Sequence, residues 1–159
     1  MILTRYTACG EPFGLMQIDL DYFKDVNDTL GHAAGDHVLQ EVARILVDET
    51  RDQDTIVRAG GDEFVLIFHR LTEPASLSAI AERLLARIEK PILFADQPCR
   101  VSASIGITVS DDYSPPDAEK MLIDADQALY ASKNAGRARH TFVNRTAVPE
   151  MDTDARDMR

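Results

Sequence analysis

Residues 60–61 are both glycine, and they separate two runs of strand-forming residues, 55–58 and 63–68. A glycine pair in this position is typical of a tight turn, because glycine adopts backbone angles that other residues avoid. The second run is almost entirely apolar, as expected of a buried strand. The sequence therefore predicts an antiparallel hairpin, with Asp62 and Glu63 at its tip.

Two adjacent carboxylates at a hairpin tip have two interpretations. They can be polar residues of a solvated turn, in which Gly-Asp pairs are common. They can also hold a hard cation and, through it, a triphosphate. Asp19 lies at the end of another predicted strand, residues 13–20. If the hairpin packs beside that strand, Asp19 and Asp62 can share Mg²⁺, and a two-metal site would also use Glu63.

The rest of the chain alternates between strand-like and helix-like segments. Apolar residues at helical spacing predict the helices, with Ser76 as the N-cap of one and Gly136 at the C-terminal cap of another. The predicted helices cover residues 22–30, 35–49, 76–90 and 118–134, and the predicted strands cover residues 13–20, 55–58, 63–68, 100–109 and 140–143. This order predicts one α+β domain of ferredoxin-like type, with helices packed on a single sheet.

Composition limits the classes of function. The chain has 159 residues, which suggests one domain, and 27 acidic against 17 basic residues give a formal charge of −10. Such a surface repels polyanions, so we expect no nucleic-acid interface. The sequence shows no bilayer-spanning segment and no signal-peptide core. Cys9 and Cys99 form no metal or disulfide pattern, so we expect a cytoplasmic protein or the cytosolic portion of a larger sensor protein.

Two further pairs of polar residues also have alternative interpretations. Asn27 and Asp36 can cap neighbouring helices, or they can read a purine edge through an amide and a carboxylate. Lys133 and Arg137 are four residues apart near a predicted helix end, where cations offset the helix dipole. They can instead bind a triphosphate tail together with Lys24.

Arg51 and Asp54 lie just before the predicted hairpin. They can form an exposed ion pair of under about 1 kcal/mol. Alternatively, the arginine can bind guanine or a phosphate in a bidentate manner while the carboxylate accepts from guanine donors.

Five segments carry a series of motifs in a fixed order. Residues 60–64 read Gly-Gly-Asp-Glu-Phe. Residues 19–24 follow the pattern D-x-D-x-F-K, and residues 27–36 follow N-D-x-x-G-H-x-x-G-D. Residues 102–107 follow S-x-S-x-G, and residues 125–137 are similar to A-D-x-A-L-Y-x-A-K-x-x-G-R. Together they resemble the GGDEF family, the diguanylate cyclases that make cyclic di-GMP from two GTP molecules.

The resemblance implies a nucleotidyl-cyclase-like variant of the ferredoxin-like fold, with a mainly antiparallel central sheet flanked by helices. It places the domain at residues 11–145. The family usually begins with a helix of several turns that is mostly missing here, so residues 1–10 are expected to be an atypical or truncated lead. Residues 146–159 are expected to form a disordered acidic tail.

The resemblance also implies a metal site and a catalytic group. The implied catalytic residues are Asp62, Glu63, Gly60 and Gly61. Asp19, the Leu20 carbonyl and Asp62 would ligate Mg²⁺, with Mn²⁺ as an alternative. Glu63 would ligate a second metal or help deprotonate the attacking hydroxyl. The glycines would let the backbone approach the phosphates.

Substrate and product contacts follow from the same resemblance. The implied substrate-binding residues are Asn27 and Asp36 for guanine, and Lys24, Lys133 and Arg137 for the terminal phosphates. Arg51 and Asp54 match an R-x-x-D pattern that marks a product-inhibition site. A second arginine usually completes that site, and Arg83 and Arg87 are both candidates.

The implied function is that of a signalling enzyme, a nucleotidyltransferase that condenses two GTP into cyclic di-GMP and releases pyrophosphate. Each domain would bind one GTP, so catalysis would need a homodimer, and cyclic di-GMP would act as an inhibitor. Two alternatives remain open. One is a catalytically weak domain that senses cyclic di-GMP or GTP, and the other is a cyclase that closes one nucleotide on itself.

Overall fold

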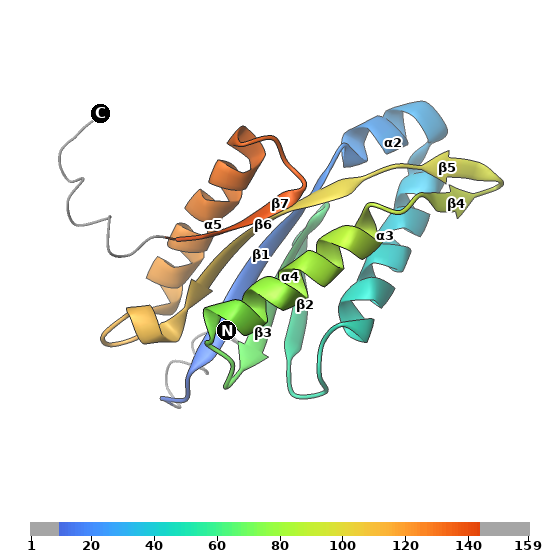
Figure 1. The fold of residues 1–159 in the computed structure, drawn as a ribbon. Coiled ribbons are helices and arrows are strands. Elements are labelled where there is room, and N and C mark those ends of the chain that lie inside the picture. The colour runs from blue at the N-terminus through green and yellow to red at the C-terminus, as the bar shows by residue number, and fades with distance from the viewer. Residues whose placement is uncertain (1–9, 144–159) are drawn as a thin grey trace.

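The computed structural model of this chain describes residues 10–143, so most of the predicted lead and the whole predicted tail lie outside the described residues. In chain order (Figure 1) the elements are β1 (Phe13–Asp21), α2 (Phe23–Leu30), α3 (His32–Asp48), β2 (Thr55–Gly60), β3 (Glu63–His69), α4 (Pro74–Ile88), β4 (Ile92–Phe94), β5 (Gln97–Cys99), β6 (Ser102–Val109), the 3₁₀ turn η1 (Ser110–Asp112), α5 (Ala118–Asn134) and β7 (Arg139–Phe142). None of the helices within this part of the chain is long and apolar enough to cross a bilayer.

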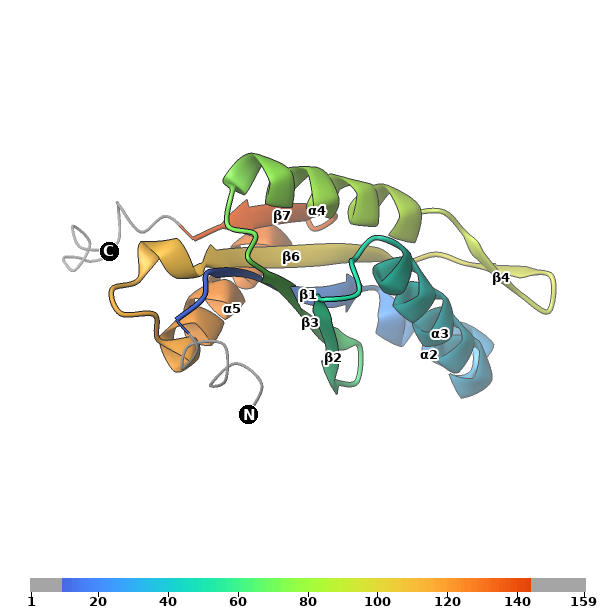
Figure 2. The ribbon, with the colours of Figure 1, turned by 90° about the horizontal axis from the view of Figure 1, so that it is seen from below.

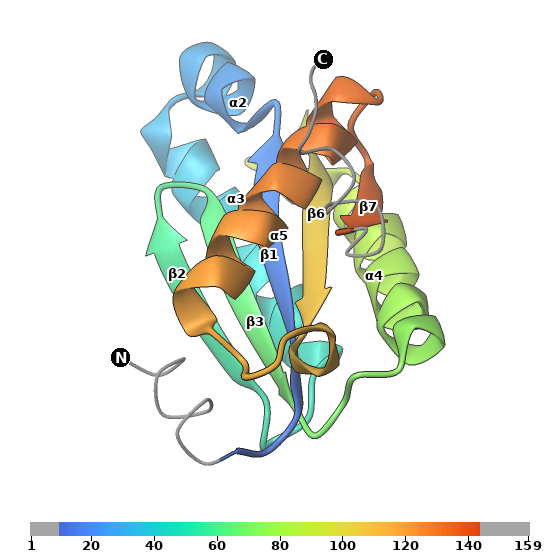
Figure 3. The same cartoon turned by 90° about the vertical axis from the view of Figure 1, so that its left-hand side faces the viewer.

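Five strands form one sheet in the order β2-β3-β1-β6-β7. All neighbouring strands are antiparallel except β6 and β7, which are parallel. Helix α5 lies across one face of the sheet, while α3 and α4 lie on the other (Figures 2 and 3). The prediction of an α+β domain with a mainly antiparallel sheet flanked by helices is confirmed.

Strand β1 is at the centre of the sheet and packs on both faces. Met16, Ile18 and Leu20 belong to the larger core, which includes the apolar residues of α3 and α4. Phe13 and Leu15 point the other way, into a smaller core completed by α5. Because side chains alternate along a strand, every second residue of β1 therefore faces α5.

Helix α5 lies very close to strand β6 at Gly106. A Cβ atom at this position would overlap the Ala125 carbonyl oxygen and the Leu129 backbone nitrogen. These are backbone atoms in the middle of a helix, so they cannot move aside as a flexible side chain would. The glycine thus sets how closely α5, which carries Lys133, can approach the sheet.

Three details differ from the sequence predictions. Helix α3 begins at His32 rather than at residue 35, because Gly31 alone separates it from α2. Ser76 is not the N-cap of α4, since the helix begins at Pro74 and Glu73 is its N-cap. A short β4–β5 hairpin was not predicted, because its strands have three residues each and its turn has no glycine.

We predict that Gly106→Ala lowers the free energy of unfolding by about 2–3 kcal/mol, because the methyl group has no space against the α5 backbone. Urea unfolding measures this change. Gly60→Ala is a suitable control, because a Cβ there meets nothing within 4 Å. Equal stability of the two variants would show that α5 is not held at this distance.

Candidate active site

The β2–β3 turn lies beside the carboxyl end of β1, at the same end of the sheet as the end of α5 (Figure 3). In the antiparallel pairing of β1 with β3, Asp19 is directly opposite Glu63. The Leu20 backbone N–H donates to the Asp62 carbonyl oxygen at 3.2 Å, which fixes the turn against the strand. The structure therefore brings together the three carboxylates that the sequence indicated as a metal site.

Negative charge is in excess at this point. The Asp19 side chain is only 18% exposed. The pKa of Asp19 is raised from 3.8 to about 6, chiefly by burial and also by the neighbouring Asp62 and Glu63 carboxylates, while Lys133 acts to lower it. A cation bound here would relieve this repulsion, so the electrostatics suit a cationic ligand.

The donor set also fits a hard divalent cation. Within residues 10–143, no group of three or more His, Cys, Asp or Glu side chains is arranged to hold a metal on its own. Mg²⁺ usually takes only one or two carboxylates from a protein and completes its shell with phosphate and water oxygens. Asp19 and Asp62 supply the one or two carboxylates that such a shell requires.

A hollow of about 410 Å³ opens beside these carboxylates. Asp19 and Glu63 line it from the sheet, and Tyr130 and Lys133 line it from α5. A small anionic ligand in this hollow would lie beside both the carboxylates and the Lys133 cation.

Two of the three predicted phosphate-binding cations contact carboxylates of β1 at this end of the sheet. Lys133 Nζ is 3.5 Å from Asp19 Oδ2 and 3.3 Å from Asp21 Oδ1. Arg137 Nε is 3.9 Å from the same Asp21 oxygen. Lys24 instead forms an exposed ion pair with Asp28. Asp21 is buried at the centre of these contacts, and the sequence analysis did not single it out.

The predicted guanine-reading residues lie where α2 meets α3. A Cβ on Gly35 would overlap the Asn27 amide oxygen, so the glycine lets this amide lie against the start of α3. The next residue, Asp36, is exposed and lines a hollow of about 470 Å³ whose walls include Ile56 and Phe64. Polar groups beside apolar walls suit a planar base.

The two signature glycines differ in their backbone requirements. Gly61 has a φ of +34°, in the region that favours glycine, whereas the φ of Gly60 lies outside that region. A Cβ on either residue would meet no other atom of the described chain within 4 Å. Packing therefore does not explain Gly60, which lies at an irregularity in the β2–β3 pairing between Arg58 and Gly60, where glycine is common.

Arg51 and Asp54 form more than an exposed ion pair. The Asp54 side chain is 1% exposed, and Arg51 Nη2 lies 2.8 Å from its Oδ1. Arg51 Nη2 also donates to the His69 carbonyl at 2.7 Å, while the His69 N–H donates to Asp54. The guanidinium, which is partly exposed, is thus held against the end of β3 with a fixed orientation.

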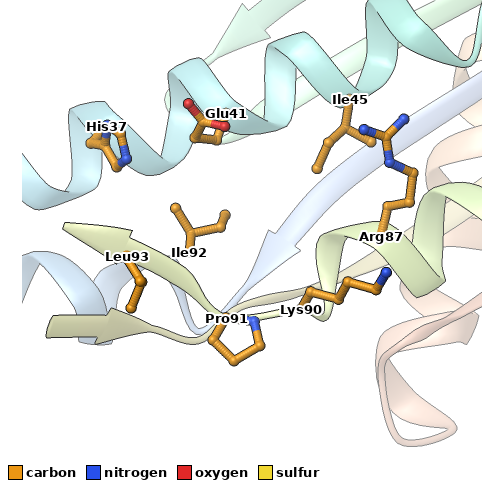
Figure 4. A pocket seen from close by; sticks show the side chains of 8 residues that line it. All are labelled: His37, Glu41, Ile45, Arg87, Lys90, Pro91, Ile92 and Leu93. Carbon is orange, nitrogen blue, oxygen red and sulfur yellow. The ribbon is translucent and has the colours of Figure 1, made fainter. Parts of the chain in front are cut away.

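The two candidate second arginines both contact the end of α3. Arg83 Nε donates to Glu49 at 2.8 Å, and Arg87 bonds Glu49 and Asp48. Arg87 also lines a separate groove of about 530 Å³ between α3, α4 and β4 (Figure 4). These contacts do not distinguish between the two candidates.

Comparison with known proteins gives a consistent result. The family profile described as "Diguanylate cyclase, GGDEF domain" matches residues 3–139. Diguanylate cyclase A of Treponema denticola is 42% identical over 133 residues, which are 83% of this chain and 35% of the relative. Diguanylate cyclase DosC of Escherichia coli is 38% identical over 130 residues, 82% of this chain and 28% of the relative. The chain thus spans about a third or less of the length of the curated relatives it matches.

Solved structures share the fold. The GGDEF domain of TpbB (YfiN) from Pseudomonas aeruginosa has a TM-score of 0.83 and 31% identity, covering 95% of this chain and 88% of that one. The coiled coil and GGDEF domain of DgcB from Caulobacter crescentus, solved in complex with c-di-GMP, has a TM-score of 0.78 and 27% identity. That match covers 88% of this chain and 74% of that one.

We predict that the pKa of Asp19 makes the protein less stable as the pH rises. The folded state binds the Asp19 proton more tightly than the unfolded state does. The contribution of Asp19 to the free energy of unfolding is therefore largest below about pH 4 and is lost as the pH rises through about 6. At pH 7 in chelator, Asp19→Asn should raise the free energy of unfolding by about 1–2 kcal/mol, a value reduced for solvent screening.

Urea unfolding between pH 4 and 8 measures this effect, with the exposed Asp52→Asn as a control that should keep the wild-type slope. Millimolar Mg²⁺ should stabilise the wild-type protein more than Asp19→Asn. An Asp19→Asn protein with the same pH dependence as the wild type would contradict the assignment.

Proposed function

Because this chain belongs to the GGDEF family of diguanylate cyclases, we propose that it condenses two GTP molecules into cyclic di-GMP and pyrophosphate. The observation that carries the proposal is the meeting of Asp19 with Asp62 and Glu63 at the hairpin tip, beside Lys133. This combination of clustered carboxylates and a nearby cation suits a metal-bound triphosphate. The intact hairpin signature favours synthesis over a domain that only senses nucleotides.

We propose one role for each group of site residues. Asp19, the Leu20 carbonyl and Asp62 hold Mg²⁺ or Mn²⁺, which when bound supplies charge neutralisation at the reacting phosphate. Glu63 serves at the second metal or near the attacking hydroxyl. The phosphate cations are Lys133 and Arg137, with Lys24 on α2, and the guanine-reading pair is Asn27 and Asp36.

The reaction needs two copies of the domain. The 3′-hydroxyl of one GTP attacks the α-phosphate of the other, and pyrophosphate leaves. Each domain holds one of the two reactants, so a facing pair supplies the proximity that makes the step effectively intramolecular. Turnover per mole should therefore rise with protein concentration and reach its limit when the domains are joined.

The test uses the chain fused to a dimeric coiled coil, incubated with GTP and Mg²⁺, with chromatographic separation of the products. We predict cyclic di-GMP from GTP, and a rate lower by about 10²–10³-fold for Asp62→Ala, because charge stabilisation at the phosphate is lost. Glu119→Ala, which removes an exposed carboxylate at the other end of α5, is the matched control.

Each alternative has its own outcome in this experiment. A product cyclised from one nucleotide would replace the proposal with a different cyclase. Absence of any product from the fused dimer would favour a sensor. An active Asp62→Ala protein would show that the metal site is misassigned.

We also propose that Arg51 and Asp54 bind cyclic di-GMP as a feedback site, supported by the partly exposed, fixed guanidinium and by the similarity to DgcB. Arg51→Ala should weaken cyclic di-GMP binding by at least about tenfold, because a charged bidentate donor is lost. Calorimetric titration measures the affinity. In the Arg51→Ala protein, the rate of synthesis with added cyclic di-GMP should be nearly equal to the rate without it.

Arg44→Ala is the control for that experiment, because Arg44 also forms an ion pair three residues away, with Glu41. Asp54 keeps backbone N–H donors from residues 51 and 69 in the Arg51→Ala protein, so the loop should remain folded. Unchanged product affinity in that protein would remove the feedback site from the proposal.

A further inference from the structure

Asp21 has an environment that the proposed roles do not explain. Its carboxylate is 1% exposed at the end of β1. Ser102 Oγ and Ser104 Oγ donate to its two oxygens at 2.7 and 2.8 Å. On the other side, the Ala138 backbone N–H donates at 3.2 Å and Lys133 Nζ donates at 3.3 Å. One carboxylate thus ties strand β6 to the end of α5.

Strained backbone surrounds this carboxylate. Tyr22, Arg137 and Ala138 have φ values of 67°, 66° and 53°, which are uncommon for residues other than glycine. The Arg137 guanidinium lies 5.5 Å from the centre of the Tyr22 ring. Such conformations persist only where surrounding contacts enforce them, and they cluster at functional sites. Here the enforcing contacts meet at Asp21.

Stability alone is a poor explanation for this arrangement. Burying charges has a large desolvation cost, and apolar residues of similar volume often give equal or greater stability than a buried ion pair. A fully hydrogen-bonded carboxylate beside strained backbone instead fixes the positions of the groups that contact it. Two of those groups, Lys133 and Arg137, are cations that the proposed function assigns to the triphosphate.

We propose that Asp21 is the positioning residue for the phosphate-binding cations, holding Lys133 by an ion pair and Arg137 through the turn at residues 136–138. This inference rests on the proposed function, since it assumes that a triphosphate binds beside Asp19. Asp21 acts through its neighbours and does not itself contact the nucleotide.

The position of Lys133 shows why a second carboxylate is needed. Its Nζ is shared between Asp19 at 3.5 Å and Asp21 at 3.3 Å. A metal ion on Asp19 would repel this ammonium group. Asp21 would remain as the partner that keeps Lys133 beside the phosphates, which a site with Asp19 alone could not do.

The test compares binding of two probes by calorimetry in Mg²⁺. One is a GTP analogue with a methylene bridge between the α- and β-phosphorus atoms, and the other is GMP, which lacks the terminal phosphates. Asp21→Asn should weaken binding of the analogue by about tenfold and that of GMP by less than about twofold. Lys133→Met should give the same selective loss, and the double variant should lose little more than either single variant.

Two further variants separate positioning from folding. Asp124→Asn removes another buried carboxylate, one that accepts from Tyr113 Oη and Lys120 Nζ on and near α5. It should leave the ratio of the two affinities unchanged. Ser104→Ala keeps the charge of Asp21 but removes one donor, so it should give a smaller loss confined to the analogue, and it serves if Asp21→Asn does not fold.

The outcomes are distinct. Equal losses for both probes, or unchanged or tighter analogue binding by Asp21→Asn, would overturn the inference and leave the proposed function intact. Additive effects of Asp21→Asn and Lys133→Met would also overturn it. A wild-type protein that binds neither probe would overturn the proposed function, and the inference with it.

Discussion

The antiparallel pairing of β1 with β3 is the constraint on which the site depends. It runs without interruption from Phe13 opposite His69 to Asp19 opposite Glu63. A slip of one residue would move every side chain of β1 to the other face of the sheet, taking Asp19 away from α5. Two packed faces make such a slip costly, because Met16 and Ile18 fill one core while Leu15 fills the other. The hydrophobic core therefore specifies the position of the carboxylates.

Two features of the site lower the stability of the folded protein. Burial and two like charges raise the pKa of Asp19, and three residues other than glycine adopt left-handed backbone angles nearby. Neither feature helps the chain fold. Both are sustained by a sheet whose central strands are buried on both sides and by a helix in backbone contact with Gly106. Local rules broken at one end of a well-packed domain are characteristic of a functional site.

Much of the fold could be predicted because its signals are local. Helix α5 was predicted with its observed bounds, and the glycine turn correctly indicated the hairpin of β2 and β3. The β4–β5 hairpin has no such signal, since Ala95 and Asp96 adopt positive φ without glycine. The Ser76 capping prediction failed because Pro74 suits the first helical position, so the helix begins before the serine.

The sequence indicated several of the residues that the structure brings together at the candidate site, but not how they are organised. Alternation along β1 places Asp19 and Asp21 on one face, which the sequence shows. The partners of Asp21 come from 81, 83 and 117 residues further along the chain, beyond any local pattern. One signal was nevertheless available. Ser102 and Ser104 are two residues apart on a buried strand, so their hydroxyls share a face and need an acceptor there, and a carboxylate at the end of the neighbouring strand can satisfy both.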